Sequence, residues 1–538
     1  MIASKVQVRW AGRFAQLLFP LLLAGILIRL SDDRGPFWLG ANSDGSYQYL
    51  FNSLLVMNDL PPCHVIHPGT TVQTLGSLLL TATTPGNGVE AMTYNVLLAP
   101  ERSLMLLQVF FTAFAVIALA TTGVFEFERT GSVLCGWAVS GVALLQIETY
   151  RSLLFVHPEA LLVPLTLLLV VLLIAREQVP PGPSGKRRQR LIDVSLGLIA
   201  AAGVVTKVTF APLCLLPLLV QSGWRGVILT GGSMIVGTAG FLIPLRTQLP
   251  RVFEWFTRIA NHTGVYGEGE SGFLDPKNYF SDLWRMAAAH PVLCAVIGVS
   301  ALAGGAVTLS RPGDPRARRC SRLLLLTCAV QALGLMIVAK HPAPRYALPL
   351  AVSAAFNVSL LLELMRSSAI GRPRTIVRTI AALAALTAVA AIGHELRTSS
   401  RDLRSDRDDE IEMKRRVDER APQSKRIEYY RSSSPEFALF IGNGHAWRFF
   451  APLLSELHPN RVFFDVIRGR FESFAGAIAT EGVFSDGPRV LFGDGNLEKL
   501  APGVSFPLPP GWTMRKVDQG RISIIHQLEH VSTGSVRQ

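Results

Sequence analysis

Ionisable residues in this chain occur beside long apolar runs and are not confined to polar segments. Asp44 lies in NSDGSYQY, Glu159 in FVHPEALL and Lys207 in GVVTKVT. Ionisable groups near hydrocarbon are costly, so each is a candidate functional residue by default. We interpret Asp44 as a candidate general base, because a positioned carboxylate can accept a hydroxyl proton. Asp44 could also cap a helix that begins near Ser46, and the two interpretations agree if the carboxylate stays partly accessible.

Cations and a second acid could complete such a site. His341 and Arg345 occur in AKHPAPRYALPL, and with Lys207 they form a cationic group suited to a phosphate. Lys207 and Arg345 could instead extend only to lipid headgroups. Glu159 is the second catalytic candidate, although it follows Pro158 and could serve as a first-turn acid that the helix dipole favours. The candidate substrate-pocket residues are Tyr47, His64, His67, His157 and Tyr346.

Metal-binding patterns in the chain are weak. His64 and His67 form a His-x-x-His pair in PPCHVIHPG, but a pair without a third ligand is poor evidence for a metal, and the prolines could simply shape a rigid loop. The six cysteines include no CxxC pair and lie mostly inside apolar runs, where free thiols behave as small hydrophobes. The sequence predicts no definite cofactor and does not indicate a divalent metal, although it is compatible with one.

Apolar runs must position these residues. The chain has 538 residues, of which 49% are hydrophobic and 17% charged, whereas soluble domains carry about 25% charged residues. The net charge is +13, but Lys and Arg concentrate in short loops between apolar runs, which indicates membrane topology and not nucleic-acid binding. A helix needs about 20 apolar residues to cross the hydrocarbon. We predict an all-α polytopic membrane protein with eleven spans, near 14–31, 102–125, 131–149, 153–175, 191–207, 208–223, 226–246, 290–309, 321–339, 346–365 and 376–393.

The positive-inside rule orients these spans. A further apolar segment, 70–84, is short and rich in threonine, and if it crossed, every later loop would change sides. With eleven spans, almost all short basic loops share the N-terminal side, which is then cytoplasmic. We therefore predict that 70–84 is a re-entrant or interfacial helix. Outer loops 32–101 and 247–289 and the C-terminal tail then lie on the other side, together with the candidate site residues.

The tail differs from the rest of the chain in composition. Residues 1–394 form the transmembrane module, 395–432 a charged linker or helix, and 433–538 a small α/β domain. Within the first outer loop, apolar residues of 46–58 recur on one helical face, which predicts a helix in the membrane interface. We predict the strands of the tail from its short apolar runs, 437–441, 461–467, 489–493 and 521–526.

Two glycine-rich stretches of the tail could suggest phosphate binding. They are FIGNGHAW (440–447), which we place between a strand and a helix, and GDG (493–495). Their spacing matches neither a P-loop nor a dinucleotide fingerprint. We interpret both as turns.

Taken in order, the motifs resemble the polyprenyl-phosphate-dependent membrane glycosyltransferases of GT-C type, the superfamily that includes protein mannosyltransferases and the lipid A aminoarabinose transferase. The matching features are Asp44 after the first span, HPEALLVPL at the outer end of a span, the Thr206–Lys207 pair, and RYALPL late in the chain. The resemblance covers residues 10–395. The family often has two acids in the first loop, whereas here Asn42 stands two residues before Asp44. The second acid would then be Glu159 or Glu268, and metal dependence stays open.

The resemblance implies a glycosyltransferase of the bacterial inner membrane, with a polyprenyl-phosphate sugar as donor and a lipid or glycan of the cell envelope as acceptor. Asp44 would be the general base of an inverting reaction, and Lys207, His341 and Arg345 would neutralise the departing phosphate. A transporter or flippase is the alternative, but such proteins place their charged residues near the bilayer midplane. A scaffold that presents its tail as a binding module would explain the tail but not the grouped ionisable residues.

Overall fold

A computed structural model describes residues 2–530 of the chain with several gaps. The gaps are Asp44, 67–68, 180–182, Ser222, 264–268, 311–312, 367–373, 423–424, Ile467, Asp486, Pro488 and 495–505. Only the backbone is described for residues 2–6, 8, 41 and 374–388.

Within the described residues, seven helices are long and apolar enough to cross a membrane. Two of them are composite: Arg9–Arg34 comprises the second half of α1 (Ile2–Ala15) and all of α2 (Leu18–Arg34), and Pro344–Arg366 comprises η6 (Pro344–Ala347) and α17 (Leu348–Arg366). The other five are α6 (Pro100–Thr130), α9 (Pro158–Glu177), α10 (Pro183–Thr206), α15 (Pro291–Ser310) and α16 (Pro315–Val338). Two bent pairs bring the number to nine if each is one span. The nine segments coincide with nine of the predicted spans, which confirms the polytopic helical fold class.

The bent pairs each contain a sharp change of direction. One pair joins α7 (Val133–Gly141) and η2 (Val142–Leu145) to α8 (Ile147–Leu153) at 68°. The other joins α12 (Trp224–Phe241) to η4 (Ile243–Gln248) and α13 (Leu249–Asn261) at 69°. The helix α14 (Tyr279–Ala289) precedes α15.

The remaining two predicted spans are not among these nine segments. Residues 208–223 contain η3 (Val208–Cys214) and α11 (Leu215–Leu219), both packed against α10. A 3-10 helix rises about 2.0 Å per residue, so the two elements together cover roughly 22 Å, less than the hydrocarbon thickness of about 30 Å. Residues 376–393 lie within α18 (Arg374–Arg420). The sidedness that rests on eleven crossings stays a prediction.

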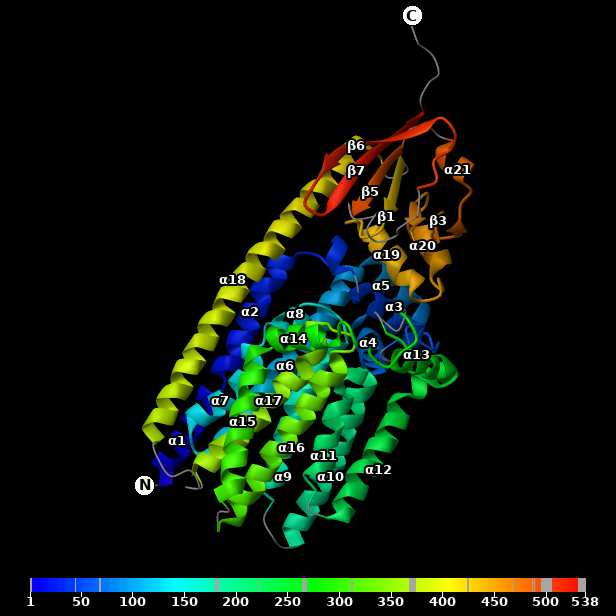
Figure 1. The fold of residues 1–538 in the computed structure, drawn as a ribbon. Helices are drawn as coiled ribbons and strands as arrows, with labels where there is room; N and C mark the ends of the chain where they lie inside the picture. Colours follow the sequence, from blue (N-terminus) through cyan, green and yellow to red (C-terminus); the bar gives the residue numbers. More distant parts are fainter. Residues whose placement is uncertain are drawn as a thin grey trace, which may run out of the picture. The chain divides into compact units, whose positions relative to one another are not determined.

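The chain divides into two compact units. The first comprises Met1–Ile28, Val65–Val72 and Gln108–Arg397, and the second comprises Arg29–His64, Gln73–Leu107 and Thr398–Gln538. In the first unit, α10 and α17 both pack on α9, and α16 packs on α17 (Figure 1). The tail shares the second unit with most of the first outer loop, and α18 continues from one unit into the other as a single helix.

Short helices of the first outer loop precede α6. They are η1 (Gly40–Asn42), α3 (Ser46–Met57), α4 (Thr70–Thr83) and α5 (Val89–Leu98). The helical structure predicted at 46–58 and 70–84 is thus confirmed. Their place at the membrane interface stays a prediction. Nearly every residue of α3 is buried, because α19 (Pro435–Gly444) packs on it and Asn52 Nδ2 donates to the His445 carbonyl at 3.0 Å. The side of α3 that carries Phe51 and Asn52 therefore faces the tail domain, a partner that periodicity alone does not indicate.

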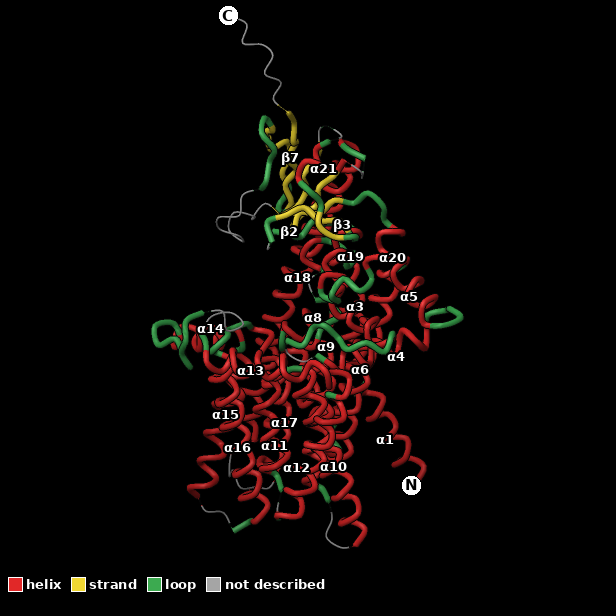
Figure 2. The backbone as a smooth tube through the Cα atoms, turned by 90° about the vertical axis from the view of Figure 1, so that its right-hand side faces the viewer, coloured by secondary structure: helices red, strands yellow, loops and turns green. Residues whose placement is uncertain are grey.

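The described part of the tail contains one seven-stranded sheet, whose strands are yellow in Figure 2. The strands are β1 (Arg426–Tyr429), β2 (Val462–Asp465), β3 (Arg470–Ser473), β4 (Gly476–Ala477), β5 (Arg489–Asp494), β6 (Trp512–Gln519) and β7 (Ser523–His530). Their order is β4-β3-β2-β1-β5-β7-β6. The central strand β1 pairs in parallel with β2, Ile427 opposite Val462, and with β5, Ile427 opposite Leu491, while the other pairs are antiparallel. The predicted small α/β domain is confirmed.

Helices cover both faces of this sheet. One face packs Ile427 and Tyr429 with Phe484 of α21 (Thr480–Phe484). The other packs Phe492 against Val417 of α18, and α19 and α20 (Ala451–Leu457) connect β1 to β2.

Two expectations for the tail are corrected. Residues 437–441 lie in α19 and not in a strand, since the Pro435 that follows the N-cap Ser434 starts a helix. FIGNGHAW therefore follows no strand, and its two glycines belong to the end of α19. Of GDG, Gly493 and Asp494 end β5, while Gly495 lies outside the described residues.

Candidate active site

The first turn of α9 carries the acid at the centre of the site. Pro158 occupies the first helical position, which suits its fixed φ and missing N–H, and His157 is the N-cap with extended backbone. Glu159 therefore enters the first turn, where the helix dipole stabilises a carboxylate. Glu159 is only 2% exposed, so its charge needs partners within the protein.

Lys207 supplies the nearest cation. The α10 helix ends at Thr206, and Lys207 takes an extended conformation before η3 begins. Its Nζ donates to Glu159 Oε1 at 2.5 Å and lies 4.3 Å from the centroid of the Tyr346 ring. Lys207 is 3% exposed, so the ammonium and the carboxylate form a buried ion pair. Removing either partner would leave an uncompensated buried charge.

Two further groups approach the same carboxylate. His157 Nδ1 lies 3.2 Å from Glu159 Oε2, and Arg345 Nε lies 3.5 Å from Oε1. The Arg345 side chain is 48% exposed. Apart from His157, one carboxylate is matched against two cations, Lys207 and Arg345. The cluster therefore keeps one surplus positive charge, which Arg345 presents at the surface.

Neighbouring contacts fix the segments that carry the cluster. Thr206 Oγ1 lies 2.6 Å from Thr71 Oγ1, so the end of α10 is held against the start of α4. His290 Nε2 lies 2.8 Å from the Pro344 carbonyl, next to Arg345. His341 lies on the same connection between α16 and α17 as Arg345. A contact between His341 and a phosphate stays a prediction.

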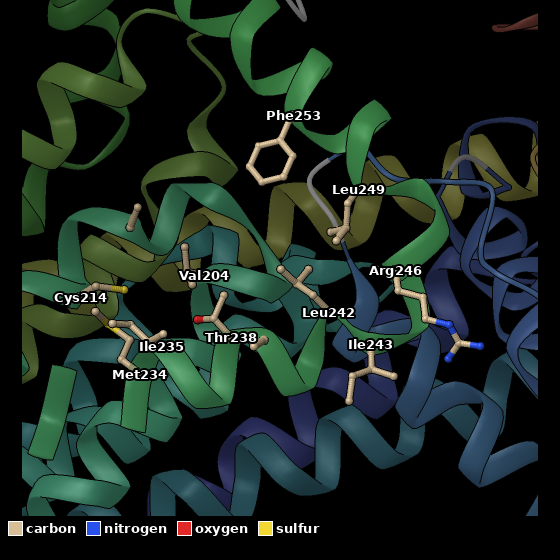
Figure 3. A pocket seen from close by; sticks show the side chains of 12 residues that line it. Val204, Cys214, Met234, Ile235, Thr238, Leu242, Ile243, Arg246, Leu249 and Phe253 are labelled. Atoms are coloured by element: carbon tan, nitrogen blue, oxygen red, sulfur yellow. The ribbon is translucent and has the colours of Figure 1, made fainter. Parts of the chain in front are cut away.

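An apolar groove adjoins the Lys207 segment. Its volume is about 590 Å³, and residues of α10, η3, α12, η4 and α13 line it (Figure 3). Two lining residues, Val204 and Ala211, stand three positions before and four positions after Lys207. Figure 3 shows the guanidinium of Arg246 at the edge of the apolar side chains. A mostly apolar groove with a cation at its edge suits a ligand that has a hydrocarbon chain and an anionic head.

Several predicted site residues cannot be compared with this cluster. Asp44 and His67 lie outside the described residues, as does Glu268. Tyr47 and His64 belong to the second unit, whereas His157, Glu159, Lys207, Arg345 and Tyr346 belong to the first and are brought together. The roles assigned to all of these residues stay predictions.

Tyr47 and His64 have defined surroundings within the second unit. The buried Tyr47 hydroxyl donates to Glu101 Oε1 at 2.9 Å. Burial, and then the nearby Glu101 carboxylate, raises the pKa of the Tyr47 phenol well above its usual value. The His64 ring lies edge-on to Tyr49, with the ring centroids 5.7 Å apart.

Sequence reasoning missed Glu101. This residue stands in the first turn of α6 after Pro100 and accepts the Phe37 N–H at 2.8 Å in addition to the Tyr47 hydroxyl. The Arg34 guanidinium lies 3.6 Å from the Phe37 ring centroid. A signal was present, since the Pro-Glu of LAPERS repeats the Pro-Glu of VHPEAL at the start of another span.

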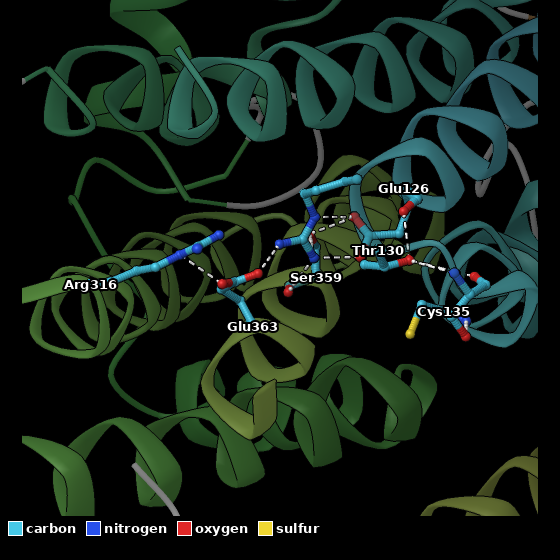
Figure 4. Close-up of polar contacts among 8 residues, drawn as sticks. Glu126, Thr130, Cys135, Arg316, Ser359 and Glu363 are labelled. Carbon is cyan, nitrogen blue, oxygen red and sulfur yellow. Dashed lines mark hydrogen bonds and ion pairs between the residues drawn. The ribbon is translucent and has the colours of Figure 1, made fainter. Parts of the chain in front are cut away.

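A second ionic network in the first unit has a structural character (Figure 4). Arg129 of α6 donates to Glu126 and, at 2.5 Å, to Glu363 of α17. Arg316 of α16 lies 2.7 Å from the same Glu363, and Ser359 Oγ donates to Glu126 at 3.1 Å. Two acids balance two arginines, so the network ties three helices together and keeps no surplus charge. It was not predicted, because its members are far apart in sequence.

Known proteins resemble the chain in structure only. No protein-family model and no curated protein sequence matches it. It is similar to crystal structures of ArnT from Cupriavidus metallidurans, with a TM-score of 0.49 for the apo state and 0.45 for the form bound to undecaprenyl phosphate. Each comparison has 12% sequence identity and covers 94% of this chain and 97% of the other. Because both the identity and the TM-scores are low, the function proposed below rests on the chain's own residues.

Proposed function

We propose that this protein is a membrane glycosyltransferase that moves a sugar from a polyprenyl-phosphate donor to an acceptor in the cell envelope. One juxtaposition supports the proposal. Arg345, which bears the surplus positive charge, lies beside the buried Glu159–Lys207 pair, and residues that line the apolar groove stand within four positions of Lys207. The motif order that resembles the GT-C glycosyltransferases supports it independently.

The donor has two parts that match these two features. Its polyprenyl chain fits the groove, where lining residues such as Met234, Ile235 and Leu242 offer apolar contact. Its phosphate fits beside Arg345, whose planar guanidinium binds phosphate oxygens in pairs. Arg246, at the groove edge, is the second cation available to the phosphate.

The transfer is a single displacement at the sugar. A hydroxyl oxygen of the acceptor attacks the anomeric carbon, and the bond from that carbon to the phosphate oxygen breaks. The carbon inverts, and the lipid leaves as polyprenyl phosphate. Asp44 accepts the proton of the attacking hydroxyl. Arg345, with Lys207 and His341 in support, offsets the charge that develops on the leaving phosphate, usually a large catalytic contribution.

Glu159 fits a positioning role better than direct proton transfer. One of its oxygens meets Lys207 and Arg345, and the other meets His157. The carboxylate thereby holds both cations at fixed distances, and a carboxylate so engaged has little capacity left to accept a substrate proton. We therefore assign the proton transfer to Asp44 alone.

Replacing Arg345 by Ala tests the donor site. The purified protein is mixed with a bacterial membrane lipid extract that contains polyprenyl-phosphate sugars, and mass spectrometry follows the release of polyprenyl phosphate. We expect Arg345→Ala to slow release on the order of 100-fold, as for loss of one transition-state donor. Arg285→Ala is the matched control, because Arg285 is an exposed arginine of α14 that pairs with Asp282. Release by Arg345→Ala at the wild-type rate would remove Arg345 from the site.

Replacing Asp44 by Asn tests the base. The variant should bind the donor lipid normally but lose release, because an amide cannot take up the hydroxyl proton at neutral pH. Unchanged turnover would exclude Asp44 as the general base while leaving the donor site intact.

A further inference from the structure

Two exposed aromatic residues stand on an unusual turn of the tail domain, which we name the 447–449 turn. Trp447 is 46% exposed and Phe449 is 51% exposed, between α19 and α20. Trp447 and Arg448 have positive φ angles of 51° and 59°, a conformation that bulky residues adopt rarely. Such a backbone persists only where surrounding contacts hold it, and it is common in ligand-binding segments.

Contacts behind the turn hold this conformation. The Arg448 N–H donates to the Asn443 carbonyl at 2.8 Å, and the Phe450 N–H donates to Asn443 Oδ1 at 3.1 Å. Phe450 is buried and packs edge-on against Phe51 of α3, with the ring centroids 5.6 Å apart. The turn is therefore fixed on α3, while Trp447 and Phe449 remain at the surface.

Arginine side chains cluster beside the same turn. Arg448, Arg468 and Arg470 all pair with Glu472, whose side chain is fully buried. Arg468 also pairs with Asp465 at 2.9 Å. Three arginines against two acids leave a surplus positive charge, and the side chains of Arg468 and Arg470 are half exposed.

The second unit contains the helix α5, which leads along the chain directly into a helix long and apolar enough to cross a membrane. The α20 helix packs on α5, and the two helices adjoin in both views (Figures 1 and 2). The α5 helix ends at Leu98, and the membrane-spanning helix α6 begins two residues later. The α5 helix exposes Val89, Tyr94 and Leu98. Exposed apolar residues at the point where a chain enters the hydrocarbon are expected to contact lipid.

We propose that the 447–449 turn, together with the exposed side of α5, docks the tail domain onto the surface of an anionic phospholipid bilayer. Trp447 and Phe449 enter the boundary between headgroups and acyl chains, where aromatic rings are favoured. Arg468 and Arg470 meet the lipid phosphates, because basic residues are attracted to anionic membrane surfaces. The domain is then held by this contact in addition to its covalent link through α18.

Quenching of Trp447 by brominated lipid tests this proposal. The full chain is reconstituted into phosphatidylglycerol nanodiscs with and without bromine near the glycerol end of the acyl chains. The emission of Trp447 is obtained as the difference between wild type and Trp447→Phe. Trp512→Phe is the matched control, because Trp512 lies in the same domain and packs against Phe484, with ring centroids 4.7 Å apart.

We expect bromine to remove about half or more of the Trp447 emission, since a docked ring lies within the headgroup and acyl boundary. The Trp512 emission should not change. Equal Trp447 emission in brominated and plain nanodiscs would overturn the docking proposal. The double variant Arg468→Gln and Arg470→Gln tests the charge contribution. In phosphatidylglycerol nanodiscs, we expect its Trp447 quenching to fall to the level that wild type shows in phosphatidylcholine nanodiscs. Undiminished quenching in this variant would overturn the assignment to anionic headgroups.

Discussion

Replacing Glu159 by Gln should destabilise the protein more than replacing its partner Lys207 by Met. In Glu159→Gln, the Lys207 ammonium stays buried and retains the Tyr346 ring at 4.3 Å, while the nearby Arg345 is a like charge. In Lys207→Met, the Glu159 carboxylate keeps His157 at 3.2 Å and Arg345 at 3.5 Å. The charge that remains buried is therefore compensated much better in Lys207→Met than in Glu159→Gln.

The magnitudes follow from burial. Glu159 and Lys207 are 2% and 3% exposed, and removing one partner of such a pair costs about 3–5 kcal/mol. We expect this full cost for Glu159→Gln. For Lys207→Met we expect about half of it, roughly 2 kcal/mol, because Arg345 still compensates the remaining carboxylate and His157 still contacts it. The double variant should be more stable than Glu159→Gln alone, since it removes both charges and pairs at contact distance are not additive.

Thermal unfolding in detergent with a thiol-reactive dye would measure the order of stabilities. The first unit contains the buried thiols Cys214, Cys320 and Cys328, which report its opening. We expect the lowest Tm for Glu159→Gln, followed by the double variant or Lys207→Met, with wild type highest. Equal Tm losses for the two single variants, or a double variant at the sum of both, would refute the unequal compensation inferred from the geometry.

Three further outcomes are expected. Burial raises the pKa of Glu428 from 4.5 to about 7, with Glu436 adding to the rise. Between these two pH values the folded tail keeps a proton that the unfolded chain loses. The free energy of unfolding should therefore fall by about 3 kcal/mol as pH rises from 4.5 through 7. In unfolding measured as a function of pH, Glu428→Gln should abolish this change. Ala239→Trp should fill the groove and raise the KM for the lipid donor on the order of 10-fold, as for lost binding energy of about 1.4 kcal/mol. Ile228→Trp should not, because Ile228 is an exposed residue of the same helix that does not line the groove. Lys340 Nζ donates to the Ile259 and Ala260 carbonyls, both at 2.7 Å, so Lys340→Met should speed amide hydrogen exchange in α13, and unchanged exchange there would refute this anchoring.

The spans were predictable because a membrane helix must be long and apolar, a property of local sequence. The grouping of Glu159, Lys207 and Arg345 was also predictable in outline, since each ends or begins an apolar run on the same predicted side. Their pairing was not, because the 2.5 Å contact joins residues far apart in the chain and depends on how α9 packs on α10.

The tail shows where local patterns fail. The central strand β1 was not among the predicted strands, which are all apolar runs, because RIEY contains two charged residues. All four of its residues are nevertheless buried, and Ser434 donates to Glu428 at 2.6 Å. Residues 437–441 are apolar enough for a strand, but Ser434 caps a helix there by accepting the Phe437 N–H. The 447–449 turn owes its conformation to hydrogen bonds with Asn443 and to packing on α3. No local motif indicates either contact.

The central claim is that the lipid-linked sugar is cleaved at the phosphate and not carried intact. Mass spectrometry can distinguish cleavage of the donor from its transport. The wild-type protein is reconstituted and supplied with phosphate-labelled polyprenyl-phosphate sugars extracted from bacterial membranes. We expect polyprenyl phosphate to accumulate as the sugar appears on an acceptor, with neither change in Asp44→Asn. Movement of the intact donor between leaflets, with no polyprenyl phosphate formed, would contradict the proposed transferase and favour a transporter.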